Sequence, residues 1–196
     1  DVEALRCNCL RSTAFRDISF VIRKGEVLGI TGLIGCGATE VAKAVFGDYP
    51  LHEGDISVNG KAVRSVTPAQ MVRNRVAYVS ENRKSEGLNL IASVRKNLSI
   101  TIQKQLSRLG FIRFAQENQR TDAMIDRLSI RLSSSSQLVG TLSGGNQQKV
   151  VFGKWLLSEI DVFIMCEPTR GIDVGSKREI HRIIRDLAAE GMAVLV

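Results

Sequence analysis

A strand, a glycine-rich loop and a helix follow one another early in the chain, and this succession restricts the fold more than any other feature. Residues 27–31 form a short apolar, β-branched run, which predicts a buried strand. After the glycine-rich stretch 32–37, apolar residues recur at helical spacing as far as Gly47, which can cap a helix C-terminus. These apolar residues are Val41, Ala42, Val45 and Phe46.

Two turn signals and another strand follow this helix. Residues 55–58 and 61–63 flank Asn59 and Gly60, a pair suited to the left-handed positions of a tight hairpin turn. Thr67 is predicted to cap a helix whose first residue is Pro68. Residues 76–79 predict a further short strand.

The rest of the chain alternates between helical and strand patterns. Strand signals disappear from about residue 93 to residue 131, where the pattern is helical. The later predicted elements are a loop at 133–136, a helix that ends near 158, a buried strand at 162–165, a helix at 176–190 ended by Gly191, and a strand from 192.

This order of elements predicts an α/β fold, a three-layer sandwich whose parallel sheet is covered on both faces. We expect a single domain over residues 1–196. Its core and a small antiparallel β part are expected to come from about residues 1–82 and 159–196. The helical stretch, about residues 83–158, is expected to be a subdomain of this fold rather than a second domain.

Composition and charge exclude several classes of protein. The 196 residues are 44% hydrophobic and 24% charged, which argues against disorder. No apolar run approaches the length of a bilayer span, and the N-terminus lacks the pattern of a signal peptide. The net charge is +7, and residues 81–131 hold ten Lys/Arg against five Asp/Glu. Because only Phe111 and Phe114 lie among these charges, a solvated helical face is favoured over a stacking platform for nucleic acid.

The four cysteines predict reduced thiols in a cytosolic protein rather than a metal site. Cys7 and Cys9 form a C-x-C pair, but no second pair and no nearby histidine accompany them. The other two, Cys36 and Cys166, are isolated in the sequence. Zinc binding is therefore not expected.

The glycine loop matches most of a phosphate-binding template, G-x-x-x-x-G-K-[ST]. Gly32 and Gly37 occupy its glycine positions, and Thr39 occupies the position that binds Mg²⁺. Ala38 stands at the lysine position, so the ammonium group that contacts the phosphates is missing. Loss of a charge-assisted hydrogen bond should weaken binding by roughly ten- to a hundredfold. Lys43 is no replacement, because it lies more than a helical turn from the loop.

A second motif, Leu142-Ser-Gly-Gly-Asn-Gln-Gln-Lys149, precedes a predicted helix. A serine hydroxyl and two glycines at a helix N-terminus present hydrogen-bond donors to a phosphate without a blocking side chain. On this octet, about a hundred residues after the glycine loop, the chain resembles the ATP-binding-cassette ATPases. The resemblance implies that Ser143, Gly144, Gly145 and Gln147 contact a nucleotide.

The stretch Val162-Phe-Ile-Met-Cys-Glu-Pro-Thr169 resembles the family's next motif, in which four apolar residues precede Asp and Glu. The aspartate holds the magnesium shell, and the glutamate polarises the attacking water. Here Cys166 replaces the aspartate, and Glu167 is kept as the expected catalytic base. A thiol is a poor ligand for Mg²⁺. We therefore expect the chain's own ATP site to be impaired.

Three further stretches narrow the resemblance to the C-terminal cassettes of monosaccharide importers of the ribose, galactose and arabinose type. They are Pro168-Thr-Arg-Gly-Ile-Asp-Val-Gly175, Val79-Ser-Glu-Asn-Arg-Lys84, and the polar residues after the signature glycines. In that family one polypeptide carries two cassettes, and the second often has arginine at the lysine position. Ala38 and Cys166 depart further from the pattern than usual.

The resemblance also assigns positions outside the two main motifs. Glu81 falls where a glutamine senses magnesium and couples to the membrane subunit, and Asn82 replaces the usual aspartate. The aromatic residue that stacks on adenine would lie near Cys9 or Leu10, neither of which can stack. Phe15 is a poor substitute for it.

Cassettes of this family pair head to tail, which divides the expected site residues into two sets. The first set belongs to the chain's own ATP and Mg²⁺ site: Gly32, Leu33, Gly35, Cys36, Gly37, Ala38, Thr39, Glu40, Glu81 and Glu167, with Thr39 and Glu81 as metal contacts. The second set completes the partner cassette's site: Ser143, Gly144, Gly145, Gln147 and Asp173. The resemblance implies a second cassette, transmembrane permease subunits and, indirectly, an extracytoplasmic sugar-binding protein as partners. It implies a peripheral position on the cytoplasmic face of the membrane.

Two other functions stay open at this point. The basic stretch could serve a cassette ATPase that acts on nucleic acid or ribosomes, and steeply salt-dependent DNA binding would favour that alternative. A module that binds no nucleotide is the other, and titration with a fluorescent ATP analogue would test it. His52 and His181 are expected to be solvated, and the cassette is expected to be truncated before the family's switch histidine. Isolated ATPase activity is therefore expected near background.

Overall fold

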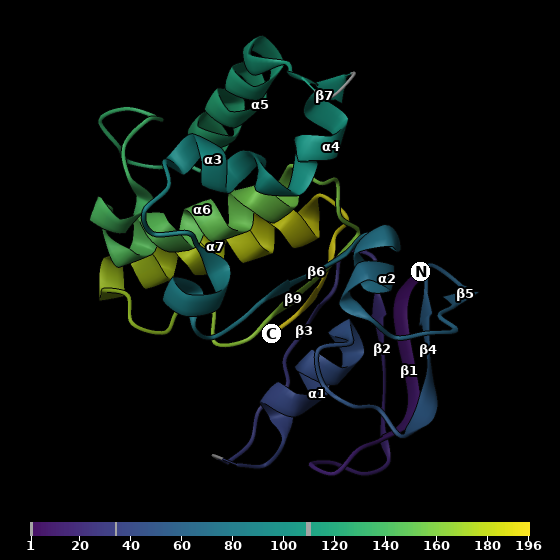
Figure 1. Ribbon diagram of the computed structural model, residues 1–196. Helices are drawn as coiled ribbons and strands as arrows, with labels where there is room; N and C mark the ends of the chain where they lie inside the picture. Colours follow the sequence, from purple (N-terminus) through teal and green to yellow (C-terminus); the bar gives the residue numbers. More distant parts are fainter. Residues whose placement is uncertain (1, 34, 109–110) are drawn as a thin grey trace. The chain divides into compact units, whose positions relative to one another are not determined.

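The computed structural model describes residues 2–33, 35–108 and 111–196, which form two compact units (Figure 1). The first unit comprises Asp1–Tyr78, Ile160–Glu167 and Ile184–Val196, and the second comprises Val79–Glu159 and Pro168–Ile183. Residues 168–183 thus group with the helical part of the chain, whereas the sequence places them in the core.

The first unit contains a four-stranded antiparallel sheet in the order β2-β1-β4-β5. Its strands are β1 (Glu3–Arg11), β2 (Ile18–Arg23), β4 (Glu53–Val58) and β5 (Lys61–Ala62). The turn between the last two is the predicted one, since Asn59 and Gly60 have φ angles of 49° and 75°. The Asn59 side chain also donates a hydrogen bond of 3.0 Å to the carboxylate of Asp161.

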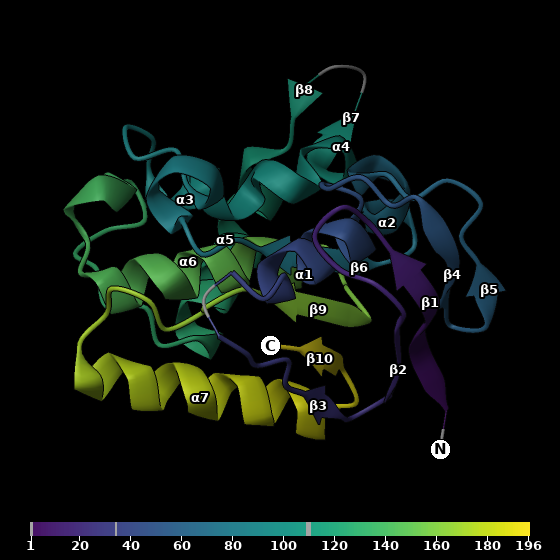
Figure 2. The same cartoon turned by 90° about the horizontal axis from the view of Figure 1, so that it is seen from below.

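A second sheet in this unit has the order β3-β10-β9-β6, and β10 pairs in parallel with both β3 and β9 (Figure 2). Its strands are β3 (Val27–Leu28), β10 (Ala193–Leu195), β9 (Val162–Met165) and β6 (Val76–Val79). Every residue of β6, β9 and β10 is buried, which was predicted for β9 alone. The prediction of a buried strand over 27–31 is wrong in part. Because β3 is the outermost strand of this order, it is short, and Val27 stays 43% exposed.

Two helices complete the first unit, α1 (Ala38–Phe46) and α2 (Pro68–Arg73). The apolar residues predicted for the inner face of α1 are all buried, and the helix contacts β9. Gly47 ends α1 with a φ of +89°, and a Cβ atom there would lie 2.6 Å from the Cα atom of Thr67. Thr67 caps α2 as predicted, because its hydroxyl accepts a hydrogen bond from the Gln70 N–H.

The second unit is mostly helical and includes a small hairpin that the sequence analysis missed. Strands β7 (Ser107–Arg108) and β8 (Phe111–Ile112) pair where only helices are predicted, because two-residue strands are too short to show a period. The helical elements are η1 (Arg83–Gly87), α3 (Val94–Ser99), η2 (Ile100–Ile102), α4 (Gln103–Leu106), α5 (Phe114–Arg127), η3 (Val139–Thr141), α6 (Gly144–Leu156) and the first part of α7 (Val174–Ala189).

The charged stretch of this unit lies largely on the outside. Arg113, Arg120 and Arg127 of the α5 region are exposed, as expected for a solvated face. Phe111 and Phe114 are also exposed, at 79% and 68%. Within the described parts of the chain, no helix combines the length and apolar character needed to cross a bilayer.

Candidate functional site

The glycine loop lies in the first unit, between β3 and α1. Gly35 and Gly37 have φ angles of 83° and 91°, a region that glycine adopts without strain. Gly37 is the N-cap of α1, and a Cβ atom there would lie 2.7 Å from the carbonyl oxygen of Ala14. The Cys36 N–H donates to the Leu33 carbonyl at 3.0 Å, which tightens the loop. Ile34, in the middle of the motif, lies outside the described residues.

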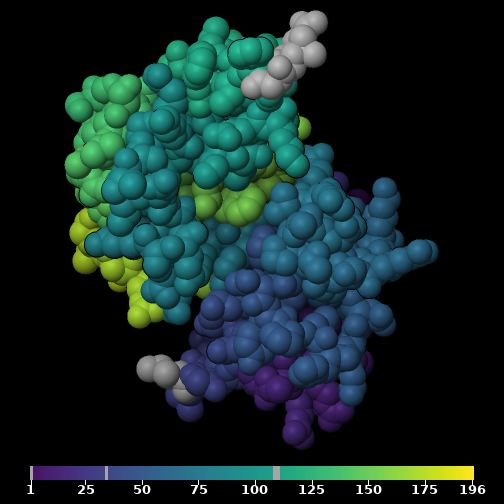
Figure 3. Space-filling model, in the orientation of Figure 1, coloured from purple at the N-terminus to yellow at the C-terminus, as the bar shows by residue number. Residues whose placement is uncertain are grey.

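The loop is open to an anion but offers it little charge. Gly32, Leu33, Gly35 and Cys36 are exposed, and the N-terminus of α1 supplies backbone N–H groups. The part of the chain that contains α1, dark blue in the space-filling view, reaches the surface (Figure 3). Ala38 brings no cation, and Glu40 adds a negative charge to the first turn of α1. Lys43 lies in the last turn of the helix, at the opposite end from the loop. The local charge is thus poorly matched to a triphosphate.

The residues after β9 also lie in the first unit. Cys166 is 7% exposed, and Glu167 is exposed with a φ of 45°, an uncommon angle for a residue with a side chain. A magnesium ion requires oxygen ligands, so the buried thiol at position 166 does not fit one. Glu167 retains the carboxylate expected of a base.

Neither Cys9 nor Leu10, the two positions where a ring would stack on adenine, carries an aromatic side chain. Leu10 is fully buried, and Cys9 is exposed, with its N–H donating to the Ser19 hydroxyl at 2.7 Å. Phe15 is only 6% exposed and lies beside Gly37, since a Cβ atom on that glycine would be 3.6 Å from the Phe15 Cβ. Burial therefore removes the Phe15 ring from any ligand at the surface.

The signature octet forms the N-terminal end of α6 in the second unit. Ser143 is the exposed N-cap, and its hydroxyl oxygen accepts hydrogen bonds from the side-chain amide of Asn146 at 2.9 Å and from the Asn146 N–H at 3.5 Å. The first N–H groups of an α-helix have no partner within the helix and point to its N-terminal end. We call residues 143–145 the signature tip.

The two glycines of the signature tip are required by packing inside this unit. A Cβ atom on Gly145 would lie 2.3 Å from the Ser176 hydroxyl oxygen. A Cβ atom on Gly144 would lie 2.8 Å from Nη2 of Arg83 and 3.1 Å from the Gly171 carbonyl oxygen. The sequence explains the glycines by access for a phosphate, and the structure adds a close approach of three chain segments as a second reason.

Gln147 lies differently from what the resemblance implies. It is 4% exposed, and its side-chain amide donates to the carbonyls of Leu142 and Val139 at 3.2 and 3.3 Å. Its amide oxygen is buried, and no residue that the structure describes forms a hydrogen bond with it. The side chain therefore supports the turn before α6 from inside rather than facing outward with Ser143.

The loop before α7 lies against the signature tip and is held by two residues from the segment after β6. Arg170 forms an ion pair with Glu81. Arg83 donates to the Arg170 carbonyl at 2.6 Å and to the Gly171 carbonyl at 2.9 Å. Sequence reasoning missed both arginines, because neither the period nor the spacing of the chain signals a contact over almost ninety residues.

Asp173 caps α7 in this structure. Its carboxylate accepts hydrogen bonds from the N–H and the hydroxyl of Ser176, at 2.9 and 2.7 Å. These bonds lower the pKa of Asp173 below its ordinary value. The cap explains why α7 begins at Val174, two residues earlier than predicted.

The expected site residues lie in both units, and only those in the second unit lie close to one another. Glu81, Ser143, Gly144, Gly145 and Asp173 gather in the second unit around Arg83 and Arg170. The glycine loop, Cys166 and Glu167 belong to the first unit. Within the described ranges, no cluster of three His, Cys, Asp or Glu side chains could hold a metal ion.

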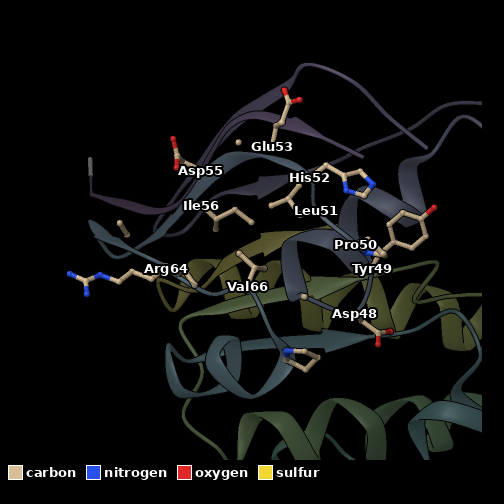
Figure 4. Close-up of a pocket in the computed structure, with 15 residues that line it drawn as sticks. Asp48, Tyr49, Pro50, Leu51, His52, Glu53, Asp55, Ile56, Arg64 and Val66 are labelled. Atoms are coloured by element: carbon tan, nitrogen blue, oxygen red, sulfur yellow. The ribbon is translucent and has the colours of Figure 1, made fainter. Parts of the chain in front are cut away.

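A separate pocket of about 800 Å³ lies in the first unit after α1 (Figure 4). Tyr49, His52 and Glu53 are among the residues that line it, and Ile56 and Val66 lie between them and Arg64. None of the residues expected to contact nucleotide is part of this lining. The pocket is therefore distinct from both groups of expected site residues.

The chain is similar to known proteins over most of its length. A family model described as "ABC transporter" matches residues 15–170. The ribose import ATP-binding protein RbsA of Geobacillus kaustophilus is 47% identical over 182 residues, which are 93% of this chain and 37% of that protein. A putative ribose/galactose/methyl galactoside import ATP-binding protein of Agrobacterium fabrum is also 47% identical, over 93% of this chain and 36% of its own length. The chain therefore spans little more than a third of these relatives.

Solved structures share the fold at low sequence identity. A nucleotide-free ATP-binding cassette from an ABC transporter matches with a TM-score of 0.81 at 20% identity, over 98% of this chain and 80% of that one. A cassette in its ADP conformation matches with a TM-score of 0.80 at 20% identity, over 100% and 80%. The parallel sheet, the antiparallel sheet and the helical part are thus a known combination.

Proposed function

The chain belongs to the ABC transporter family as an ATP-binding domain, and from this we propose that it is the second cassette of a monosaccharide importer. Its substrate class is a pentose or hexose, and its parent chain carries another cassette. Its similarity to the ribose and galactose import proteins supports this class. The transporter's permease subunits and its extracytoplasmic binding protein would select the sugar, and the cassette would sit on the cytoplasmic face of the membrane.

We propose that this chain's own ATP site is degenerate. Ala38 removes the phosphate-contacting cation, and the buried Cys166 removes an oxygen ligand. Mg²⁺ bound with ATP would neutralise phosphate charge, and we propose that Thr39 would contact it. Glu167 keeps the carboxylate of a base. The isolated cassette should hydrolyse ATP at close to the background rate.

The signature tip is the part of this chain for which we propose an active role in nucleotide binding. Ser143 is exposed at the N-terminus of a thirteen-residue helix, and the two glycines that follow it add no side chains of their own. Such an end attracts anions through its dipole and its unpaired donors. We propose that Ser143, Gly144 and Gly145 bind the terminal phosphate of ATP held by the partner cassette. Asp173 orders the adjoining loop, and Gln147 supports the tip from inside.

Hydrolysis at the partner's site would then drive transport. Donors that meet the γ-phosphate draw the two cassettes together, and loss of that phosphate removes the contact. We propose that the helical subdomain within the second unit, approximately residues 83–150, transmits this motion to the permease. The whole transporter is the ATP hydrolase, and this chain completes the hydrolytic site without supplying its base. Nucleic acid is not expected as a partner.

A substitution in the signature tip tests the proposal in the complete, reconstituted transporter. Ser143→Arg should reduce ATP hydrolysis and sugar uptake to background, because a long side chain blocks the approach of the phosphate. Ala38→Lys alone should change both rates little. Ser134→Arg, at an exposed serine in the same unit, is the matched control. Normal transport by the Ser143 variant would refute the proposed division between the two sites.

A further inference from the structure

Arg83 lies beneath the signature tip with its charge almost removed from water. The residue is 9% exposed, and its Nη1 and Nη2 atoms donate to the carbonyls of Arg170 and Gly171 at 2.6 and 2.9 Å. Its Nε atom is buried and has no hydrogen-bond partner in the part of the chain that the structure describes. Nη2 lies where a Cβ atom on Gly144 would come within 2.8 Å.

This guanidinium lacks a neutralising carboxylate among the described residues. Glu81, two residues before Arg83 in the sequence, forms an ion pair with Arg170 instead. Burial lowers the pKa of Arg83, with no acidic neighbour to offset the effect. An arginine nevertheless remains charged at neutral pH. The unit therefore keeps a full positive charge next to Gly144.

The position of this charge is unfavourable for the cassette alone. The N-terminus of α6 carries the positive end of a helix dipole, and a second positive charge beside it raises the electrostatic energy. Natural helix N-termini attract acidic groups, yet the first turn of α6 contains none. An anion that arrives at the signature tip would relieve both effects at once.

We infer that the charge of Arg83 acts with the signature tip to stabilise a terminal phosphate, making Arg83 a positioning residue for ATP hydrolysis. Arg83 would act in two ways. It holds the loop at Arg170 and Gly171 against Gly144, and it adds positive potential under the donors of Ser143 and α6. The inference rests on the proposed function, because the phosphate comes from the partner cassette's nucleotide.

Two substitutions separate the charge from the packing. Arg83→Gln keeps an amide donor for one carbonyl and removes the charge, whereas Arg83→Lys keeps the charge and loses the planar fork. In the complete transporter, Arg83→Gln should lower kcat for ATP hydrolysis about tenfold, with a smaller change in KM. Arg83→Lys should stay within about threefold of the unaltered protein. Arg113→Gln, at an exposed arginine of the same unit, should leave both constants unchanged.

Inhibition by orthovanadate, a mimic of the transferred phosphate, adds a readout that packing alone does not move. Arg83→Gln should raise the vanadate concentration for half-inhibition about tenfold, and Arg83→Lys should restore it. Melting curves of the purified variants establish that each is folded.

The results distinguish this inference from the proposal that it rests on. Equal impairment by Gln and Lys would show a structural clamp and overturn the role of the charge, as would full activity of Arg83→Gln. If Ser143→Arg abolishes hydrolysis while Arg83→Gln behaves like the Arg113 control, the proposed function stands and this inference fails. If Ser143→Arg is silent, the proposed function itself fails.

Discussion

Gly145 of α6 and Ser176 of α7 approach so closely that a Cβ atom on the glycine would lie 2.3 Å from the serine hydroxyl oxygen and 2.5 Å from its Cβ. Gly145→Ala should therefore destabilise the protein by about 1–3 kcal/mol, because a well-packed contact must open to admit a methyl group. Denaturant unfolding measures this change. Gly29→Ala is the control, since a Cβ atom there meets nothing within 4 Å.

A substitution at Ser176 tests whether the clash with its side chain causes this destabilisation. Ser176→Gly removes both clashing atoms, so the Gly145→Ala change should cost less in that background than in the natural protein. The single Ser176→Gly variant provides the reference, because it also loses the hydrogen bond to Asp173. Additive effects of the two substitutions would contradict the steric explanation.

Lys149, the last residue of the signature octet, joins α6 to α7. Its ammonium is 2.7 Å from the Glu179 carboxylate and donates to the Ser129 carbonyl at 3.0 Å, with the lysine side chain 5% exposed. Lys149→Met should destabilise the protein by about 1–3 kcal/mol, because it removes the ion pair and the hydrogen bond that a buried ammonium makes. Arg131→Met at an 84% exposed side chain, which also faces Glu179, should cost well under 1 kcal/mol in denaturant unfolding.

The same pair predicts a dependence on acid. The hydrogen bond from Lys149 lowers the pKa of Glu179 below 4.5, so the carboxylate favours the folded state above pH 4.5. This contribution should disappear as the pH falls through the lowered pKa. The difference in unfolding free energy between the natural protein and Glu179→Gln should therefore shrink below pH 4.5. A difference that stays constant down to pH 3 would contradict this assignment.

Lys154 predicts a further dependence on pH, this time in base. Burial lowers its pKa from 10.5 to about 8, and its ammonium donates to the Gly87 carbonyl at 2.6 Å. Between these two values the unfolded chain binds a proton that the folded chain has released, so stability should rise with pH. Relative to Lys154→Met, the gain should be at most about 1.4 kcal/mol per pH unit. A flat difference between pH 8 and 10 would show that the amine titrates normally.

Thiol labelling tests whether the chain's own site holds a nucleotide. Cys9 and Cys36 are exposed, whereas Cys7 and Cys166 are buried, and burial raises the pKa of Cys7 to about 12. A maleimide should therefore label two cysteines rapidly. Because Cys36 lies in the glycine loop, bound ATP would protect it.

We expect no protection of Cys36 by millimolar ATP and Mg²⁺, since Ala38 and Cys166 weaken the site. A variant with both Ala38→Lys and Cys166→Asp should show protection of Cys36 while Cys9 stays reactive. Strong protection in the natural sequence would show that its own site binds ATP after all.

Several elements could be read from the sequence because short-range rules determine them. The Asn59-Gly60 turn adopts the left-handed angles that this pair favours. Thr67 and Ser143 cap the helices that follow them, since a serine or threonine hydroxyl reaches an N–H only two or three residues away. The glycine loop before α1 was predictable for the same reason, because its angles exclude other residues locally.

Contacts between distant segments could not be read in this way. Nothing near Arg83 in the sequence indicates that it reaches a carbonyl 87 residues later, or that this contact needs Gly144. The burial of Gln147 and the edge position of β3 also depend on neighbours from elsewhere in the chain.

The sequence alone therefore determined the local geometry of the caps, turns and glycine loop, and with it the family's motifs. Only the tertiary structure decided which of those motifs meet. The physical reason is that backbone angles and caps depend on a few adjacent residues, whereas burial of a charge such as Arg83 depends on how whole segments pack around it.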